Sequence, residues 1–352
     1  MKVLMVTPRV DELHPILGFI PTWINNLAKR VKILHVLTLG YNEKTYLLDN
    51  VIVHSLDRRK NKLGKIIYFN NTMLKLRKKV DVVFCHMYPD LAALSALYGR
   101  LLGIPVVWFR AHGSINLTAR IAYFLVSRVV TSSEQGFKIK GNKVIIIGQG
   151  IDTNKFKPAD RPERENKVIL AVGRISPIKN YETLIKAANI LINEKKMKNL
   201  SFVIVGGVPV ASQRGYFERL KKMVKEFKLE GYIEFIGPMS YGDIVSYYQN
   251  CDIFVNPSHA SSLEKTVLEA MACEKPVITS NIAYYLDVFD EELRKKCYFE
   301  KNDYKALADR IEYFLNNDET SLKKKLREIV VQHHSVEHLM DSLVNIFKEV
   351  TT

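Results

Sequence analysis

The sequence has few of the features that mark a secreted, disulfide-bonded or membrane-spanning protein. Its 352 residues include four scattered cysteines and no Cys-x-x-Cys pair, a usage typical of a reducing compartment and unlike a zinc site. No window approaches roughly 18 uncharged apolar residues, so no membrane-spanning helix is expected. The first eight residues indicate a buried strand and a turn rather than a signal peptide. We therefore expect a cytoplasmic protein, either soluble or peripheral on the inner face of the cell membrane.

Acidic residues are scarce in the first half of the chain. Residues 1–165 hold 26 Lys and Arg against 12 Asp and Glu, whereas residues 166–352 hold 26 against 25. Nearly all of the net charge of +15 therefore belongs to the first half. Such asymmetry indicates that this half meets an anionic partner. A generally lysine-rich, solvated surface is the alternative.

Short apolar runs rich in β-branched residues alternate with helical patterns throughout. Fully apolar strands separated by helices predict parallel sheets that are covered on both faces. We predict an α/β fold with two Rossmann-like, doubly wound domains that face a central cleft. The expected domains are residues 1–157 and 158–334, followed by a helix at 335–352, N-capped by Ser335, that packs back toward the first domain. The polar stretch 152–166, with Pro158 and Pro162, is the expected hinge. The predicted strands are Val3–Val6, Ile33–Leu37, Val51–His54, Val80–Cys85, Val106–Phe109, Arg128–Thr131, Val144–Ile147, Val168–Val172, Phe202–Val205, Ile233–Phe235, Ile253–Val255 and Val277–Thr279.

Two cations follow the strand at 168–172. Arg174 and Lys179 lie five residues apart on a loop that opens a helix, and Asn180 is a candidate N-cap. Ligands of open parallel sheets bind beyond the carboxyl ends of the strands. Two positive charges and a helix N-terminus directed at one point suit a diphosphate. Incidental surface charges on a βα loop are the alternative.

Two further strand ends carry weaker signals. Gly206 and Gly207 follow the strand at 202–205, where glycine lets backbone approach a ligand or simply makes a tight turn. His112 follows the strand at 106–109 and precedes Gly113. Such a histidine could face the cleft and hydrogen-bond a sugar or phosphate, or it could be satisfied within its loop.

The strand at 253–255 runs into a polar loop and then into a helix with an apolar stripe. Glu269 borders that stripe, so we expect a half-buried carboxylate that can accept two hydrogen bonds from a ribose diol. A glutamate favoured by the helix dipole is the alternative. Ser261 and Glu264 match a capping box, which predicts that the helix opens near Ser261. A ligand-binding role for Glu264 is equally open.

Together these segments resemble glycosyltransferase family 4, retaining enzymes of GT-B fold, over essentially the whole chain. His112 falls where the first domain of that family places a donor-contacting histidine. The other matching segments are Gly173–Lys179, similar to the Arg/Lys pair that binds the donor diphosphate; Ile204–Pro209, similar to a Gly-rich turn; Pro257–Val277, similar to the signature ending Leu-Glu-Ala-Met-Ala-Cys-x-x-Pro-Val; and Gly148–Pro158, similar to the stretch entering the hinge.

Three positions depart from the family pattern. Ser261 stands where the first glutamate of Glu-x7-Glu usually contacts the donor sugar, and Glu264 either compensates or only caps the helix. The paired glycines after the first strand are reduced to Gly18. Gln149 replaces a common asparagine before the hinge glycine.

The resemblance implies transfer of a hexose from a nucleotide-diphosphate sugar to a glycan, a lipid-linked acceptor or a phosphorylated acceptor. Arg174 and Lys179, with His112, would be catalytic, because preorganised cations stabilise the charge on the leaving diphosphate. The sequence contains no Asp-x-Asp, so we expect no metal and no cofactor. The expected donor-binding residues are Glu269, Glu264, Ser261, Ser262, Leu263, Lys265 (a possible further cation), Gly173, Gly206, Gly207 and Gly18.

The basic segment Arg58–Lys65 leads into a helical pattern with Ile66, Ile67, Met73 and Leu74. It predicts docking on anionic lipid or on a phosphorylated acceptor, and a core helix with a solvated face is the alternative. A sugar-nucleotide epimerase or a phosphorylase would share the two-domain cleft, but we find neither a second acid/base carboxylate pair nor a cofactor lysine. A nucleic-acid-binding protein is disfavoured, because no basic helix is interleaved with aromatic residues.

Overall fold

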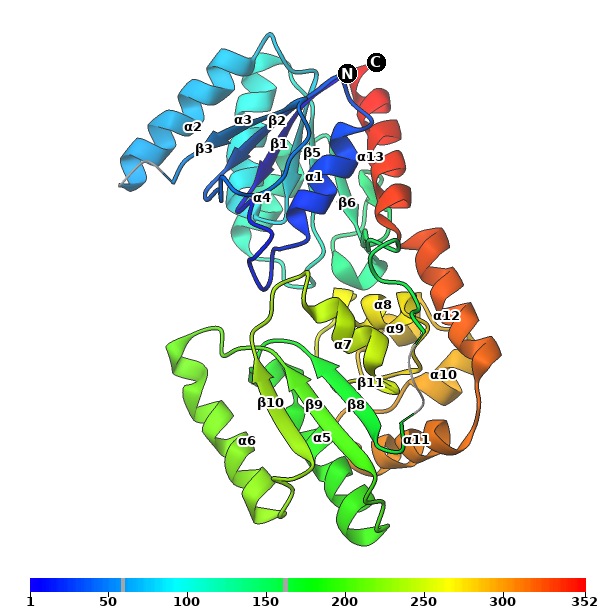
Figure 1. Ribbon diagram of the computed structural model, residues 1–352. Helices are drawn as coiled ribbons and strands as arrows, with labels where there is room; N and C mark the ends of the chain where they lie inside the picture. Colours follow the sequence, from blue (N-terminus) through cyan, green and yellow to red (C-terminus); the bar gives the residue numbers. More distant parts are fainter. Residues whose placement is uncertain (58–60, 161–163) are drawn as a thin grey trace. The chain divides into compact units, whose positions relative to one another are not determined.

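A computed structural model of the protein describes residues 1–57, 61–160 and 164–352. Arg58, Arg59 and Lys60 of the basic segment, and Pro162 of the expected hinge, lie outside the described residues. The chain forms two compact units, each an α/β unit built on a parallel sheet, as the sequence predicts (Figure 1). Unit 1 comprises Met1–Asp152, Ser240–Gly242 and His333–Thr352, and unit 2 comprises Thr153–Met239 and Asp243–Gln332. Within the described ranges, no helix is long and apolar enough to cross a membrane.

Unit 1 contains a seven-stranded parallel sheet in the order β3-β2-β1-β4-β5-β6-β7. Its inner strands are buried, because helices cover both faces of the sheet, whereas the edge strands at 51–55 and 144–146 are only partly buried. Every strand predicted for this half is present. The strands are β1 (Lys2–Thr7), β2 (Ile33–Thr38), β3 (Val51–Ser55), β4 (Val82–His86), β5 (Val106–Phe109), β6 (Arg128–Thr131) and β7 (Val144–Ile146).

Three helices cover one face of this sheet and two cover the other. Helices α2 (Lys62–Leu76), α3 (Pro89–Leu102) and α4 (Leu117–Leu125) share one core with the sheet. On the opposite face, α1 (Ile20–Ala28) packs beside α13 (Val336–Thr351), drawn in blue and red in Figure 1.

Helix α13 completes the second core of unit 1 from the far end of the sequence. The Ser335 hydroxyl accepts a hydrogen bond from the His338 amide at 3.2 Å, which confirms the predicted N-cap. The helix buries Leu339, Met340, Leu343 and other apolar residues against the sheet and α1. Burying a leucine or methionine side chain contributes about 1.5–3 kcal/mol, so α13 is a principal source of stability for unit 1.

Unit 2 contains a five-stranded parallel sheet in the order β10-β9-β8-β11-β12. All five strands are again predicted by the sequence. The strands are β8 (Lys167–Val172), β9 (Leu200–Val205), β10 (Ile233–Gly237), β11 (Ile253–Asn256) and β12 (Val277–Thr279). The helices in this part of the chain are α5 (Tyr181–Asn189), α6 (Arg214–Glu226), α7 (Ile244–Asn250), α8 (Lys265–Ala272), α9 (Ile282–Asp287), α10 (Glu291–Cys297), α11 (Tyr304–Asn316) and α12 (Thr320–His333).

The strand order of unit 2 reverses between β8 and β11. From β8 the chain continues outward through β9 and β10, and from β11 it continues in the other direction through β12. Right-handed crossovers that run in opposite directions lie on opposite faces of a sheet, so the connections that start from β8 and β11 continue on opposite faces. Doubly wound sheets bind their ligands at this switch point, beyond the carboxyl ends of the strands.

The loops after β8 and β9 are packed backbone against backbone. The Ile175 amide donates to the Gly207 carbonyl at 2.9 Å. A Cβ atom added to Gly206 would lie 1.9 Å from the Gly173 carbonyl oxygen, which is far inside any permitted contact. Gly206 is therefore required by the close approach of the neighbouring loop.

Replacing Gly206 by alanine should lower the free energy of unfolding of unit 2 by about 1–3 kcal/mol, because the loop after β8 must shift. Gly215 in α6 is a matched control, since a Cβ atom there would meet nothing within 4 Å. Gly215→Ala should be neutral or raise stability by up to about 1 kcal/mol, as expected for alanine in a helix. Urea unfolding of both variants tests the difference, and equal stabilities would contradict it.

Candidate active site

The loop after β8 carries the two predicted cations. It contains one turn of 3-10 helix (Pro177–Lys179) and ends at Asn180, which lies at the N-cap position of α5 with φ 50°. The Asn180 side chain donates to the Thr183 hydroxyl at 2.7 Å and makes no capping bond to a backbone amide. Arg174 is exposed, and the Lys179 side chain is only 11% exposed.

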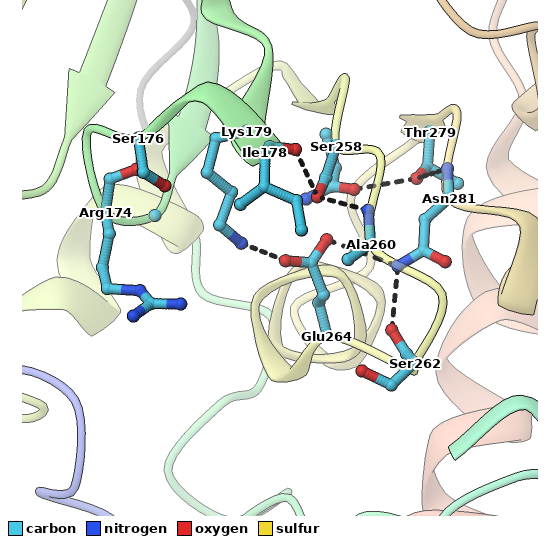
Figure 2. A network of polar contacts seen from close by, with 12 residues as sticks. Arg174, Ser176, Ile178, Lys179, Ser258, Ala260, Ser262, Glu264, Thr279 and Asn281 are labelled. Atoms are coloured by element: carbon cyan, nitrogen blue, oxygen red, sulfur yellow. Dashed lines mark hydrogen bonds and ion pairs between the residues drawn. The ribbon is translucent and has the colours of Figure 1, made fainter. Parts of the chain in front are cut away.

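Lys179 forms an ion pair with Glu264, whose side chain is 12% exposed. The second carboxylate oxygen of Glu264 accepts from Asn281 Nδ2 at 3.3 Å, and the same amide donates to the Ser262 carbonyl at 2.9 Å. Figure 2 shows the carboxylate between the Lys179 ammonium and the Asn281 amide, with the Arg174 side chain on the other side of Lys179. In the chain as described, Arg174 has no ion-pair partner.

Glu264 is ionised in this environment. Burial raises the pKa of its carboxyl group. The attraction to Lys179 and the hydrogen bonds to Lys179, Asn256 and Ser258 act in the opposite direction and together outweigh burial, so the net pKa is lowered. The Glu264 carboxylate therefore carries a negative charge beside Lys179 at neutral pH.

Hydrogen bonds between three loops hold this pair in place. The Ser258 hydroxyl donates to the Ile178 carbonyl at 3.2 Å, which joins the loop after β11 to the loop after β8 (Figure 2). The Asn281 amide N–H donates to the Thr279 hydroxyl at 3.1 Å, which orders the turn after β12. Because these groups are buried, they restrict the positions available to Lys179 and Glu264.

Helix α8 begins at Lys265, so the predicted opening near Ser261 and its capping box are wrong. Glu264 occupies the N-cap position itself, and its side chain makes no capping bond. The loop before it uses its polar groups differently: the His259 amide donates to the Ile178 carbonyl at 2.8 Å. The Glu264 carboxylate pairs instead with Lys179, 85 residues away in the sequence.

Glu269 lies one turn further along α8 and is more buried than expected. It is 5% exposed rather than half-buried, and one carboxylate oxygen accepts from the Tyr248 hydroxyl at 2.8 Å. Burial raises the pKa of Glu269, although Tyr248 and the attraction to Lys265 lower it in part. Burial lowers the pKa of Lys265, which weakens it as a further cation.

The remaining predicted residues are divided between the units. Ser261 is half-buried, whereas the Leu263 side chain is buried in the core and leaves only its backbone for a ligand. Gly18 and His112 belong to unit 1. His112 is exposed, and its Nδ1 atom accepts from the Ser114 amide at 3.2 Å.

The sequence interpretation missed Asn281, Tyr284 and Tyr248. The Tyr284 hydroxyl donates to the Glu264 carbonyl at 2.6 Å and so fixes the start of α8. Asn281 comes two residues after the predicted strand at 277–279, and a polar residue just beyond a strand is the signal that identified the other loops. The two tyrosines lie within helices and carry no such signal. In the ranges that the structure describes, no group of three or more His, Cys, Asp or Glu side chains could hold a metal ion.

Comparisons with known proteins identify relatives of this chain. The model of a family described as glycosyl transferases group 1 matches residues 152–330, just over half of the chain. An uncharacterized glycosyltransferase of Methanocaldococcus jannaschii, MJ1178, is 27% identical over 358 aligned positions, covering 93% of this chain and 92% of that protein. A D-inositol 3-phosphate glycosyltransferase of Kineococcus radiotolerans is 29% identical over 153 positions, 40% of this chain and about a third (34%) of that protein.

A solved structure shows the same fold over the whole chain. The crystal structure of Anabaena Alr3699/HepE in complex with UDP and glucose superposes with a TM-score of 0.78, covering 99% of this chain and 100% of that one. The two sequences are 17% identical, so this likeness concerns the fold alone. The predicted GT-B fold is confirmed.

Removing one partner of the Lys179–Glu264 pair should destabilise unit 2 more than removing both. Glu264→Leu leaves a mostly buried ammonium unpaired, which costs about 3–5 kcal/mol, whereas Lys179→Met combined with Glu264→Leu leaves no unpaired charge. Urea unfolding of Lys179→Met, Glu264→Leu, the double variant and the wild type gives the free energies of a double-mutant cycle. A double variant no more stable than the single variants would contradict a coupled pair.

Proposed function

The chain belongs to the glycosyl transferases group 1 family, and from that premise we propose that it moves a hexose from a nucleotide-diphosphate sugar to an acceptor with retention at the anomeric carbon. The observation that carries the proposal is the cluster of Arg174, Lys179 and Glu264 at the switch point of the unit 2 sheet. The HepE complex with UDP and glucose supports a UDP-hexose as the first donor to test.

Arg174 and Lys179 bind the donor diphosphate. Breaking the bond between sugar and diphosphate builds negative charge on the leaving phosphate oxygens, and preorganised cations stabilise that charge. Arg174 is exposed and has no ion pair in the described chain, so its guanidinium is available. An ammonium group has three N–H donors, so Lys179 can hold a phosphate oxygen while it still contacts Glu264.

Backbone groups complete the diphosphate site. The backbone amides of Ser262–Lys265 lie just before and at the N-terminus of α8, where the helix dipole favours an anion. Gly173, Gly206 and Gly207 keep side chains away from the ends of β8 and β9, so the backbone can approach the phosphates. The cations and amides supply the stabilisation, and the proposal requires no cofactor.

Glu269 binds the ribose and Glu264 binds the hexose. An ionised carboxylate accepts hydrogen bonds from both hydroxyls of a diol, and Tyr248 orients the Glu269 carboxylate. Ser261 stands where the family has a sugar-contacting glutamate. Glu264 takes over that contact, because its side chain does not cap the helix. The pair with Lys179 links recognition of the sugar to recognition of the phosphate.

The acceptor is proposed to bind unit 1, with His112 contacting the donor. The excess of Lys and Arg in the first half favours an anionic molecule, and the D-inositol 3-phosphate glycosyltransferase relatives support a phosphorylated one. A glycan or a lipid-linked acceptor fits the same reaction. All four cysteines are free and buried, which supports a cytoplasmic location, soluble or peripheral on the inner face of the membrane.

Lys179→Ala should lower kcat by about 10²–10³-fold, because one donor to the leaving charge is lost. The variant also leaves Glu264 unpaired and is less stable, so kcat is compared at a temperature where circular dichroism shows that it is folded. A thermal-shift screen of wild type with UDP, GDP and ADP sugars first names the donor; a ligand at 100 times its Kd stabilises by about 2.7 kcal/mol. Lys222→Ala in α6, whose side chain is 77% exposed, is the matched control. Turnover of Lys179→Ala at the wild-type rate would overturn the assignment.

As the pH is lowered, donor affinity should begin to fall at a higher pH than it would if a carboxylate with an ordinary pKa bound the ribose. Burial raises the pKa of Glu269, so lowering the pH protonates it earlier and removes an acceptor for the ribose. Lys265→Met removes an attraction that lowers this pKa, so the decline should move to higher pH. Glu269→Gln should bind the donor weakly at every pH and lose the decline. KM for the donor, measured from pH 5 to 9 in wild type and both variants, tests this difference in pH dependence. A decline in Glu269→Gln like that of wild type would contradict it.

A further inference from the structure

The loop after β5 carries the exposed His112, and its imidazole ring is held by the residue two positions further on. The Ser114 amide donates to His112 Nδ1 at 3.2 Å, and the Ser114 hydroxyl lies 2.8 Å from the same nitrogen. A backbone amide can only donate, so Nδ1 is the acceptor in this contact. In a neutral imidazole one nitrogen accepts and the other carries the proton. The proton of neutral His112 is therefore on Nε2.

Two neighbouring strand ends hold the backbone of this loop. The His112 amide donates to the Gly136 carbonyl at 2.7 Å, in the loop after β6. On the other side, Arg110 Nη2 donates to the Ser114 carbonyl at 3.2 Å, and Arg110 Nη1 donates to the Met87 carbonyl at 3.1 Å, in the loop after β4. These contacts restrict the positions that the His112 imidazole can take.

Arg110 is unusual for a buried cation. It is 8% exposed, and its hydrogen-bond partners are two carbonyl oxygens. In the ranges that the structure describes, no carboxylate pairs with it. Burial lowers the pKa of the guanidinium, yet an arginine stays charged in proteins. A buried cation without a carboxylate is costly for folding, and such costs concentrate where ligands bind.

Arg110 also stabilises a strained turn at the end of β4. Met87 has φ 66°, and the Tyr88 amide donates to the His86 carbonyl across it at 2.9 Å. A non-glycine residue in this left-handed conformation persists only where its surroundings fix it. The hydrogen bond from Arg110 to the Met87 carbonyl therefore joins the strained turn to the loop of His112.

We infer that Ser114 and Arg110 are positioning residues that keep the proton of His112 on Nε2. His112 then offers an N–H to an oxygen of the substrate, either a sugar hydroxyl or a phosphate oxygen. It does not act as a base, because a base needs an unprotonated nitrogen at the proton that it removes. That nitrogen is Nδ1, and the Ser114 amide already donates to it. The role in sugar transfer rests on the proposed function, whereas the position of the proton does not.

NMR of the nucleotide-free full chain, labelled with ¹⁵N-histidine, tests the position of the proton. The chain has nine histidines, and the resonances that disappear in His112→Gln belong to His112. At about pH 8.5, where an ordinary imidazole is neutral, wild type should show a protonated Nε2 and an unprotonated Nδ1. A protonated Nδ1 would overturn the inference, whatever the activity of the protein.

Release of UDP from UDP-glucose tests the role as a hydrogen-bond donor. Glutamine supplies an N–H but cannot act as a base, whereas alanine supplies neither. His112→Ala should lower kcat/KM by about 10²-fold or more, and His112→Gln by about tenfold or less. Equal losses in the two variants would indicate a base and would overturn the inference.

Ser114→Ala and Arg110→Lys test the positioning. The first removes the hydroxyl and the second removes the planar fork that reaches two carbonyls, so each should lower kcat/KM by about threefold to tenfold. In the His112→Ala background they should cost nothing more, because the residue that they position is absent. Ser114→Thr should behave like wild type, as should the control Ser246→Ala on α7, whose hydroxyl donates to the Asp243 carbonyl in unit 2.

Equal costs of Ser114→Ala and Arg110→Lys in both backgrounds would show a role independent of His112 and would overturn the inference. Circular dichroism of each variant should match wild type, which excludes unfolding as the cause of a loss. Wild type that releases no UDP while its His112 proton is on Nε2 would contradict the proposed function with this donor. It would leave the position of the proton intact.

Discussion

The reversal of strand order between β8 and β11 is the constraint on which the rest of unit 2 depends. Because the two central strands feed connections on opposite faces, their loops leave the sheet edge in different directions and can each present polar groups there. The Gly206 backbone then packs against Gly173, which leaves the loop after β8 one course. With the loop in this position, Lys179 contacts the Glu264 carboxylate, 85 residues away in the sequence.

Helix α8 joins two carboxylates in different electrostatic states. Glu264, before the first turn, stays charged because Lys179 compensates its burial. Burial raises the pKa of Glu269, in the second turn. The Tyr248 hydroxyl and Lys265, whose own pKa burial lowers, offset that rise only in part. A buried carboxylate without a strong cation is costly for folding, and such costs concentrate where ligands bind.

The fold could be predicted from the sequence, because each strand is an apolar run long enough to be recognised without its neighbours. The cap at Ser335 was predicted correctly, since its partner His338 is local. The start of α8 was not, because Ser261 to Glu264 satisfy a local pattern that a distant lysine overrides. Asn281 could have been predicted as a site residue, because it is a polar residue just beyond a predicted strand. The exposure of Leu117, Ile121 and Phe124 could not, because α4 is apolar on both faces and only the tertiary structure decides which one the sheet covers.

Helix α13 has a consequence for the order of events during synthesis. Its apolar residues cover the same face of the unit 1 sheet as α1, so that face is incomplete until residues 336–351 have left the ribosome. The strands and the helices α5–α11 of unit 2 have all emerged by then. We therefore expect unit 1 to complete its core after the strands of unit 2 have emerged, unlike the usual order from the N-terminus onward. Until then Val3, Met5 and Phe84 lack the part of their cover that α13 supplies.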